Sequence, residues 1–233
     1  MPSEPVVFIS GATGALGRAV AAHFERQGAR LAVVGSRQAS LDAAFSGLGD
    51  DHVKLAADLT DASAAAAAVA EAEQQLGRID ALCAIAGAFH MGEPVHATPA
   101  HAWRQMADAN VATFVNVARA AVPGMIARKS GKIVTIGSIA ALKGGAQMGA
   151  YAASKNALMR LTESMSAELK GHGINVNCVL PSTIDTEENR KAMPKADFSK
   201  WVAADDLAAV IGFLCSDAAK PIHGALIPVA GLV

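Results

Sequence analysis

The sequence predicts an α/β fold, a doubly wound, Rossmann-type parallel sheet of seven strands with helices on both faces. Short β-branched runs alternate with longer helix-like stretches, and a glycine-rich turn joins the first run to the first helix. Strands that alternate with helices form right-handed βαβ units, whose helices cover both faces of the sheet. The composition, 52% hydrophobic but only 4% aromatic, fits buried Val/Ile strands between Ala-rich helices.

The elements follow one another in a regular order. We expect strands at Val6–Ser10, Leu31–Gly35, Val53–Ala57, Ala81–Ala86, Lys132–Ile136, Ile174–Val179 and Ala225–Val229. We expect helices at Ala15–Gln27, Ser40–Ser46, Ala62–Leu76, Pro99–Arg128, Tyr151–Lys170 and Asp205–Ser216. Ala has the highest helix propensity, and Asp61 stands where it would cap the third of these helices.

No linker or internal repeat divides the chain, so we expect residues 1–233 to form a single dinucleotide-binding and catalytic domain. The one long irregular connection, charged and Pro-bearing, lies within residues 182–203. A connection of this length inside a compact domain is usually functional, so we expect a substrate lid there.

Charge and composition exclude several classes of function. A net charge of -1 without a basic run gives no field for nucleic acid or anionic lipid, and no apolar stretch is long enough for a membrane span. Cys83, Cys178 and Cys215 are far apart in sequence, which predicts free thiols and a cytoplasmic protein. The histidines lack metal-ligand spacing, so no metal is expected; His90 and His96 either line a pocket or are solvated loop residues.

The glycine-rich turn predicts a nucleotide site. Glycine permits a tight turn and a close approach of the backbone to a pyrophosphate, and the helix N-terminus offers unpaired N–H groups. The residues expected to bind are Gly11, Thr13, Gly14, Ala15, Leu16 and Gly17. The second strand ends in Ser36 and Arg37 without an acid for a ribose 2′-hydroxyl, so we expect NADP, bound partly by Arg37, with NAD as the alternative.

A serine, a tyrosine and a lysine form the most specific pattern in the chain. Ser138 follows the fifth strand, and Tyr151 and Lys155 are four residues apart at the start of a helix, which places them on one face. An ammonium near a phenol lowers the pKa of the phenol, so Tyr151 is the expected proton donor and Lys155 its partner. Ser138 is expected to orient a substrate carbonyl.

These motifs together resemble the short-chain dehydrogenase/reductase family from about Val6 to Val229. The resemblance implies an NAD(P)H-dependent oxidoreductase that transfers hydride between the cofactor and a ketone or alcohol, in a homotetramer or dimer. It implies a catalytic tetrad completed by Asn110, which would hold a water that relays protons from Lys155. It also implies further cofactor contacts at Tyr151 and at Lys155, which would bind the ribose, and at Asp58, Leu59, Ala86, Gly87, Pro181, Thr183, Ile184 and Thr186.

The chain departs from the common family pattern at two places. The glycines fall as G-x-x-G-x-x-G, and Ala84-Ile85-Ala86-Gly87 replaces the usual Asn-Asn-Ala-Gly. The second half additionally resembles quinonoid dihydropteridine reductase, through Cys178-Val179-Leu180-Pro181 and the stretch from Asp185 to Trp201. That enzyme lacks a serine corresponding to Ser138 and has an acid after the second strand, so dihydropteridine reduction is the second interpretation.

The substrate remains open at this level. Ser138 and Tyr151 are expected to contact it, and Met148 and Met193 are candidates for an apolar wall, with ordinary packing as the alternative. A β-keto thioester, a steroid, a sugar ketone and a quinonoid pterin all fit the motifs. A protein that senses NADPH without catalysis is a further alternative, but it would have no chemical need for the complete tetrad.

Overall fold

Seven parallel strands form the central sheet of the computed structural model, which describes residues 4–233. Their order across the sheet is β3-β2-β1-β4-β5-β6-β9. The strands are β1 (Val6–Ser10), β2 (Arg30–Gly35), β3 (Val53–Ala56), β4 (Ala81–Ala84), β5 (Gly131–Ile136), β6 (Ile174–Pro181) and β9 (Leu226–Val229). The predicted doubly wound, parallel sheet is therefore confirmed, with boundaries that shift by one or two residues at six of the fourteen strand ends and agree at the others.

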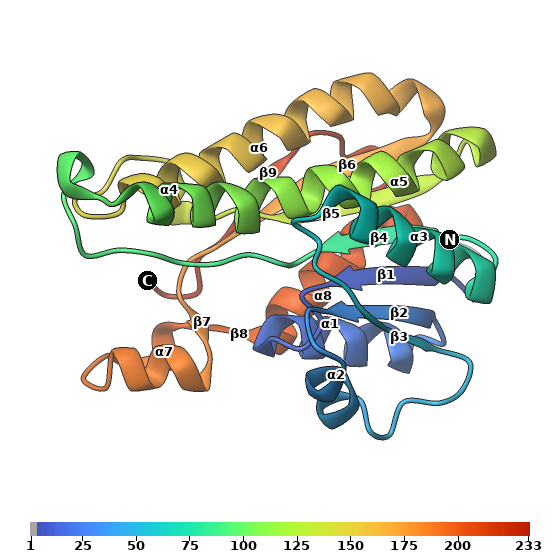
Figure 1. Ribbon diagram of the computed structural model, residues 1–233, viewed down its shortest axis with the longest axis horizontal. Helices are drawn as coiled ribbons and strands as arrows, with labels where there is room; N and C mark the ends of the chain where they lie inside the picture. The colour runs from blue at the N-terminus through green and yellow to red at the C-terminus, as the bar shows by residue number, and fades with distance from the viewer. Residues whose placement is uncertain (1–3) are drawn as a thin grey trace.

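Helices cover both faces of this sheet (Figure 1). One face carries α3 (Ala62–Leu76), α5 (Thr113–Arg128) and α6 (Gly149–Leu169), and the other carries α1 (Ala15–Arg26), α2 (Gln38–Ala44) and α8 (Ala204–Cys215). The Ala-rich α3 has the predicted bounds, and the Asp61 carboxylate accepts a hydrogen bond of 2.7 Å from the backbone N–H of Ala64, as expected of an N-cap.

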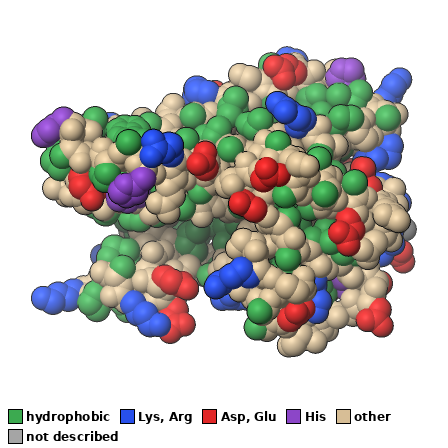
Figure 2. Space-filling view, viewed as in Figure 1, with side chains coloured by type: hydrophobic (Ala, Val, Ile, Leu, Met, Phe, Trp, Pro, Cys, Tyr) green, Lys and Arg blue, Asp and Glu red, His purple; other side chains and the backbone are tan. Residues whose placement is uncertain are grey.

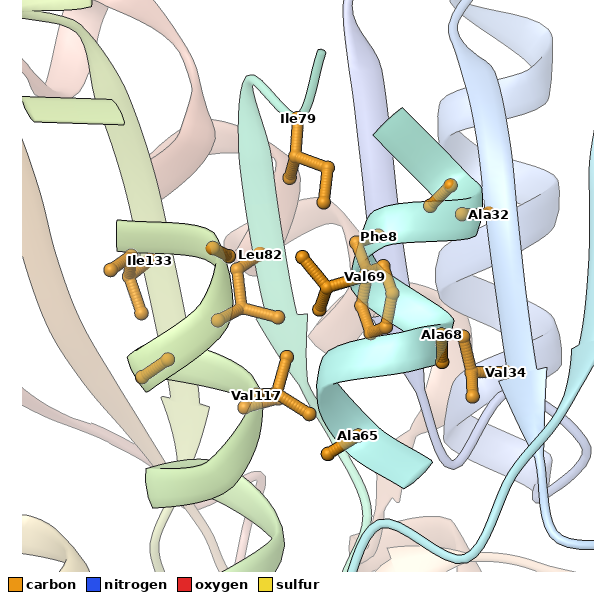
Figure 3. Close-up of a cluster of buried hydrophobic side chains, with 14 of the residues drawn as sticks. Phe8, Ala32, Val34, Ala65, Ala68, Val69, Ile79, Leu82, Val117 and Ile133 are labelled. Carbon is orange, nitrogen blue, oxygen red and sulfur yellow. The ribbon is translucent and has the colours of Figure 1, made fainter. Parts of the chain in front are cut away.

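The hydrophobic core lies in two layers because side chains of a strand alternate between faces. Val6 and Phe8 of β1 pack with α3 and α5, whereas Val7 and Ile9 pack with α1 and α8. Figure 3 shows the first layer, where Phe8 meets Val69 of α3 between the strands. These four side chains of β1 are fully buried. Their packing fixes the position of the strand and so of the turn that follows it.

The predicted helix Pro99–Arg128 is the main correction to the element assignment. It is divided into α4 (Ala100–Ala107), a π-helical turn (Asp108–Ala112) and α5. A π-turn inserts one residue into the helical repeat and frees backbone groups, which often occurs at functional sites. The helix predicted at Tyr151–Lys170 starts two residues earlier, at Gly149, so Tyr151 lies in its first turn.

The segment predicted as irregular contains regular structure. Strands β7 (Ile184–Asp185) and β8 (Val202–Ala203) pair in parallel, and between them lies α7 (Glu187–Ala192). The Thr186 hydroxyl caps α7 by accepting a hydrogen bond from the Asn189 N–H. Residues 182–203 therefore leave the main sheet and return to it as an ordered excursion (Figure 1).

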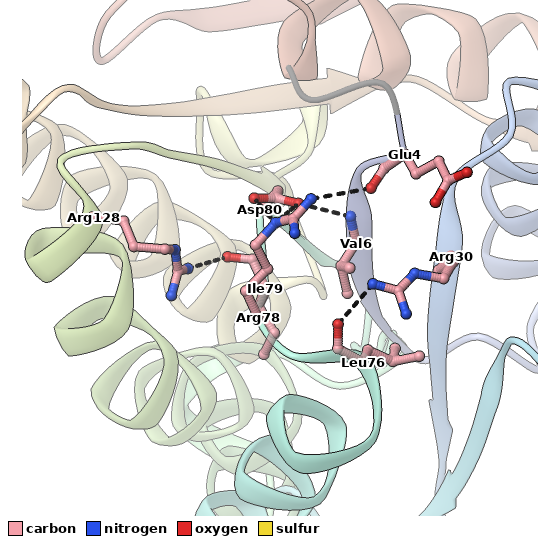
Figure 4. A network of polar contacts seen from close by, with 8 residues as sticks. All are labelled: Glu4, Val6, Arg30, Leu76, Arg78, Ile79, Asp80 and Arg128. Carbon is pink, nitrogen blue, oxygen red and sulfur yellow. Dashed lines mark hydrogen bonds and ion pairs between the residues drawn. The ribbon is translucent and has the colours of Figure 1, made fainter.

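A network of polar contacts lies at the end of the sheet where the strands begin, opposite to their carboxyl ends (Figure 4). Asp80 accepts hydrogen bonds from the Arg78 side chain and from the Val6 N–H, each 2.9 Å long. Arg30 and Arg128 donate to backbone carbonyls at the end of α3 and beside β4. These bonds tie the ends of α3 and α5 to the strands and leave the carboxyl edge free for chemistry.

Within residues 4–233, no helix combines the length and the apolar character needed to cross a membrane.

Candidate active site

The predicted site residues meet where the strands β1, β4, β5 and β6 end. The chain order reverses between β1 and β4, and in open α/β sheets ligands bind at such a switch point. The Ser10 hydroxyl there accepts hydrogen bonds from the N–H groups of Ile85 and Ala86, at 3.1 and 3.2 Å. The glycine turn after β1 is thus fixed to the segment after β4.

The glycines of this turn have three different physical roles. Gly11 has a φ of 65°, and a Cβ there would lie 2.7 Å from the Ala86 nitrogen. A Cβ on Gly17 would overlap the Gly11 carbonyl, so Gly17 permits close packing of α1 on the turn. Gly14, the N-cap of α1, has no such neighbour, since the nearest atom lies 3.5 Å away. The space beside Gly14 and the free N–H groups of the helix end fit a pyrophosphate.

A hollow of about 580 Å³ lies beside this turn at the end of β2. The side chains that line it are Thr13, Arg18, Arg37, Ser40, Ala43 and Ala44. Arg37 and the neighbouring Ser36 are exposed, so the guanidinium can reach an anionic group in the hollow. Arg18 was missed from the sequence, although its position directly after Gly17, in the first turn of α1, could have indicated a second cation near the phosphates.

The other predicted cofactor residues follow the same edge of the sheet. They are Ala15 and Leu16 in the first turn of α1, Asp58 and Leu59 after β3, Ala86 and Gly87 after β4, and Pro181, Thr183, Ile184 and Thr186 from the end of β6 into the excursion. The Asp58 carboxylate accepts hydrogen bonds from the hydroxyl and the N–H of Thr60, which lower the pKa of Asp58. The carboxylate therefore stays charged on an exposed surface.

Tyr151 and Ser138 form the reactive pair. Ser138 is buried at the end of β5, and its hydroxyl forms a hydrogen bond with the Tyr151 phenol. Burial raises the pKa of Tyr151, and the bond with Ser138 offsets part of this rise. The expected lowering of this pKa by Lys155 is wrong for this structure, because desolvation outweighs the other effects on the phenol. A neutral phenol is the form that can donate a proton.

Lys155 lies one helical turn further along α6 than Tyr151, with only 6% of its surface exposed. Its Nζ donates a 2.8 Å hydrogen bond to the carbonyl of Ile136, the last residue of β5. Burial lowers the pKa of Lys155 to about 8. A buried lysine of this kind is a common feature of functional sites, since the fold bears the cost of desolvating it.

Asn110 occupies the π-helical turn and is 1% exposed. Its amide holds Ala88 at both backbone groups: Oδ1 accepts from the N–H at 2.9 Å, and Nδ2 donates to the carbonyl at 3.0 Å. Nδ2 also donates to the Ser154 hydroxyl of α6. Asn110 therefore fastens the segment after β4 to the helix that carries the phenol and the ammonium.

Gly87 lies between Asn110 and Lys155. A Cβ on Gly87 would stand 2.7 Å from the Asn110 Oδ1 and 3.1 Å from the Lys155 Nζ. The structure thus brings all four predicted tetrad residues to one region, with Ser138 and Tyr151 in contact and Lys155 and Asn110 on either side of Gly87.

The predicted substrate contacts differ in position. Met148 is the residue before α6, three residues ahead of Tyr151, and is partly buried, whereas Met193 is 41% exposed at the end of α7. Phe89 was missed: its ring lies edge-on to the Tyr151 ring with centroids 4.8 Å apart. The sequence drew attention to His90 instead, whose Nε2 is bonded to the Glu93 carboxylate at 2.8 Å.

Among residues 4–233, no group of three or more His, Cys, Asp or Glu side chains is arranged to hold a metal ion.

Comparisons with known proteins agree with this geometry. The family model described as short chain dehydrogenase matches residues 5–197. The chain is 34% identical over 243 residues to 2-(S)-hydroxypropyl-CoM dehydrogenase 3 of Xanthobacter autotrophicus, covering 97% of this chain and 95% of that protein. It is 32% identical to galactitol 2-dehydrogenase (L-tagatose-forming) of Cereibacter sphaeroides, covering 96% and 92%. Among solved structures, levodione reductase matches with a TM-score of 0.91 and 25% identity, covering 97% and 96%.

These relatives and the sheet confirm the Rossmann-type fold and an NAD(P)-dependent oxidoreductase with relatives that are dehydrogenases of alcohols. None of the three is a pterin reductase, so the resemblance to quinonoid dihydropteridine reductase stays a prediction from sequence.

Proposed function

Because the chain belongs to the short-chain dehydrogenase family, we propose that it interconverts a ketone and a secondary alcohol with NADP(H) as cofactor. The observation that carries this proposal is the contact of Tyr151 with Ser138, together with the buried Lys155 one turn along the same helix, at the end of the sheet where the glycine turn lies. A phenol, a hydroxyl and an ammonium in this order can protonate a developing alkoxide.

Each of these residues acts on a stated atom. The cofactor, when bound, supplies or accepts the hydride. Ser138 donates a hydrogen bond to the substrate oxygen and fixes the carbonyl beside the phenol. In reduction, Tyr151 gives its proton to that oxygen, so the carbonyl π bond is lost as new C–H and O–H bonds form. Lys155 carries its charge on the same helix face as the phenol and is proposed to stabilise the phenolate once it forms and to bind the cofactor's ribose, and Asn110 would support a water that returns the proton.

The preference for NADP rests on the hollow beside β2. Two guanidinium groups, from Arg18 and Arg37, line it together with two hydroxyl-bearing side chains, and no acid is among its lining residues. Such a set fits a phosphate on the adenosine ribose, because guanidinium groups bind phosphate through paired, charge-assisted hydrogen bonds. NAD is the alternative, and it would be expected to gain nothing from these two side chains.

Cofactor titrations test this preference. Dissociation constants for NADPH and NADH are measured by nucleotide fluorescence for the wild type, Arg37→Ala and Arg18→Ala. A lost charge-assisted hydrogen bond corresponds to about 1.5–3 kcal/mol, so NADPH binding is expected to weaken by roughly ten- to a hundredfold in each variant. NADH binding should hardly change. Tighter binding of NADH than NADPH by the wild type would overturn the proposal.

The residues 182–203 are proposed to act as the lid over the substrate. Their base is fixed, since the Ser182 hydroxyl donates to the Ala230 carbonyl at 2.6 Å and the Val202 N–H donates to the Thr183 carbonyl at 3.0 Å. Ordered ends with a projecting α7 between them suit a segment that closes as one piece (Figure 1). Met193, at the end of α7, is then the lid residue proposed to reach the substrate.

A second copy of the chain is the proposed partner of the helices α4, α5 and α6. An apolar hollow of about 540 Å³ lies between them. Its lining is Trp103, Ala107, Asp108, Val111, Ala112, Val115, Asn116, Ala150, Ala153, Ser154 and Ala157. Small side chains on α6 permit close helix packing, so we propose a dimer or homotetramer. Light scattering on the wild type and on Ala157→Glu tests it, because a charge at this position should favour the monomer.

The location is proposed to be cytoplasmic, on the ground that Cys83, Cys178 and Cys215 are free and buried.

The reaction itself is tested with Tyr151→Phe. This variant keeps the ring and its packing on Phe89 but removes the proton. Turnover of a ketone panel with NADPH is expected to fall by at least a hundred- to ten-thousandfold, while the dissociation constant for NADPH stays within twofold. Unchanged turnover would refute the mechanism. An inactive wild type that binds NADPH would favour the sensing alternative, and turnover of quinonoid dihydropterin alone would favour pterin reduction.

A further inference from the structure

Large apolar side chains are exposed on the segment that follows β4. Phe89, Met91 and Val95 are 58%, 50% and 59% exposed, respectively, within seven residues of chain. Single exposed apolar residues are ordinary on protein surfaces, whereas neighbouring ones with this much uncovered surface usually mark a binding site. We call residues 89–95, which carry these three side chains, the apolar segment.

The apolar segment is held against the reactive phenol. The Phe89 ring meets Tyr151 edge to face, at an interplanar angle of 74°. Val95 lies against the first turn of α6, because a Cβ on Gly149 would stand 2.6 Å from its Cγ2. The backbone N–H of Gly92 donates to the Gln147 carbonyl at 3.0 Å. The segment and the loop before α6 therefore form one wall beside the site.

Three polar side chains of this wall have hydrogen-bond partners within the same segment. His90 pairs with Glu93, and the Thr98 hydroxyl donates to the Pro94 carbonyl at 3.0 Å. On the neighbouring loop, Leu142 is 54% exposed. Figure 2 shows a hollow between the part of the molecule that carries α7 and the helices above it, with hydrophobic side chains along its margin. The exposed fractions of Phe89, Met91, Val95 and Leu142 show that this apolar surface faces solvent rather than the interior.

We infer that the apolar segment binds an alkyl or aryl group next to the reacting carbon, so that the substrate class is an apolar ketone or secondary alcohol. This inference rests on the proposed function and names its substrate. The exposed Phe89 and Val95 offer no partner for a substrate hydroxyl, and a hydroxyl buried without a hydrogen bond is disfavoured. A polyhydroxylated ketone would lose several such bonds against this wall, whereas each methylene of an alkyl chain gains by leaving water.

A chain-length series tests the inference. The ratio kcat/KM is measured with NADPH for the 2-alkanones from butanone to 2-octanone, and 2-hexanone is compared with a ketohexose of equal carbon number. A fully buried methylene corresponds to about fourfold, so an increase of about two- to fourfold per methylene is expected in the wild type. The increase should shrink to less than half in Phe89→Ala. Phe213→Ala, which removes a 46% exposed ring from α8, serves as the matched control and should keep the wild-type dependence.

The outcomes separate this inference from the proposed function. If no ketone is reduced with either cofactor, the proposed function fails. In that case the dissociation constants of N-methyl alkanamides of the same lengths are measured by calorimetric titration. Their carbonyl resists reduction, so binding to the wall is tested without turnover. A flat chain-length dependence, an unchanged dependence in Phe89→Ala, or a ketohexose reduced as efficiently as 2-hexanone would each overturn the inference. Affinity or turnover that rises with length and depends on Phe89 would support it.

Discussion

Replacing the buried lysine should change how the stability of the protein depends on pH. Lys155 is 6% exposed, and burial lowers its pKa from 10.5 to about 8. Below pH 8 the folded protein carries a buried charge that the unfolded chain carries in water. The shift from 10.5 to about 8 corresponds to roughly 3 kcal/mol of destabilisation at neutral pH. Lys155→Met removes this cost, and it also removes the hydrogen bond to Ile136 at every pH.

The sign follows from proton uptake. Between pH 8 and 10.5 the unfolded chain holds the proton of Lys155 and the folded chain does not, so stability rises with pH in this window. Integrating the two titrations from pH 7 to 9.5 gives a gain of about 2 kcal/mol for the wild type relative to Lys155→Met. The variant lacks the hydrogen bond to Ile136 at both pH values. Its loss therefore lowers the stability of the variant equally at pH 7 and pH 9.5 and cancels when the two are subtracted.

Urea unfolding followed by circular dichroism at pH 7 and pH 9.5 measures the difference. Lys195→Met, the same substitution at an exposed position, is the control for the loss of one lysine. Refolding must be demonstrated at both pH values, and equal m-values must be found for the wild type and the variants. If the wild type and Lys155→Met change in parallel with pH, then Lys155 is not buried as a shifted lysine, and the proposed support of the phenolate by this group loses its basis.

Three further outcomes follow from the site and the fold. Gly87→Ala should reduce turnover at least tenfold in a folded protein, because the added methyl would stand 2.7 Å from the Asn110 Oδ1; steady-state kinetics with unchanged kcat/KM would contradict this. Asp61→Ala should lower the free energy of unfolding by about 1 kcal/mol in urea titrations, since it removes the cap of α3. Alcohol oxidation should accelerate as pH rises, because the raised pKa of Tyr151 keeps the phenol from acting as a base near neutral pH; a pH-independent kcat/KM for oxidation would argue against this role.

The sheet was predictable because its signals are local. The central strands β1 and β4 are buried on both faces and read as continuous apolar runs, and α3 is specified by its alanines and by Asp61 within a few residues. Tyr151 and Lys155 were equally accessible, since their spacing fixes their shared face, whereas Asn110 was predicted from the family resemblance. The π-turn at Asp108–Ala112 had no local signal: Asn110 adopts it while its amide bonds to Ala88, a contact between distant parts of the chain.

The remaining differences have the same origin. Burial decides the pKa of Tyr151, and burial depends on segments such as the one that carries Phe89 rather than on the distance to Lys155 along the helix. Arg18 was visible in sequence, but its relation to Arg37 depends on how the glycine turn and the end of β2 come together. Sequence therefore identifies residues with chemical potential, and the structure determines which of them share an environment.

The two ends of the parallel strands differ in how their charged side chains are paired. This difference shows how the fold tolerates the desolvation of Lys155. At the end of the sheet where the strands begin, the Asp80 carboxylate is paired with Arg78 and accepts from the Val6 N–H, and neighbouring bonds of Arg30 and Arg128 tie α3 and α5, on one face of the sheet, to this end (Figure 4). At the carboxyl edge, Lys155 is buried with a carbonyl as its hydrogen-bond acceptor, which is unfavourable for a charge. A site of this kind persists because the surrounding strands are fixed elsewhere. Removing the charge of Lys155 should therefore make the free energy of unfolding less dependent on pH and at the same time abolish turnover. A group whose removal helps stability but ends activity is buried for function and not for structure.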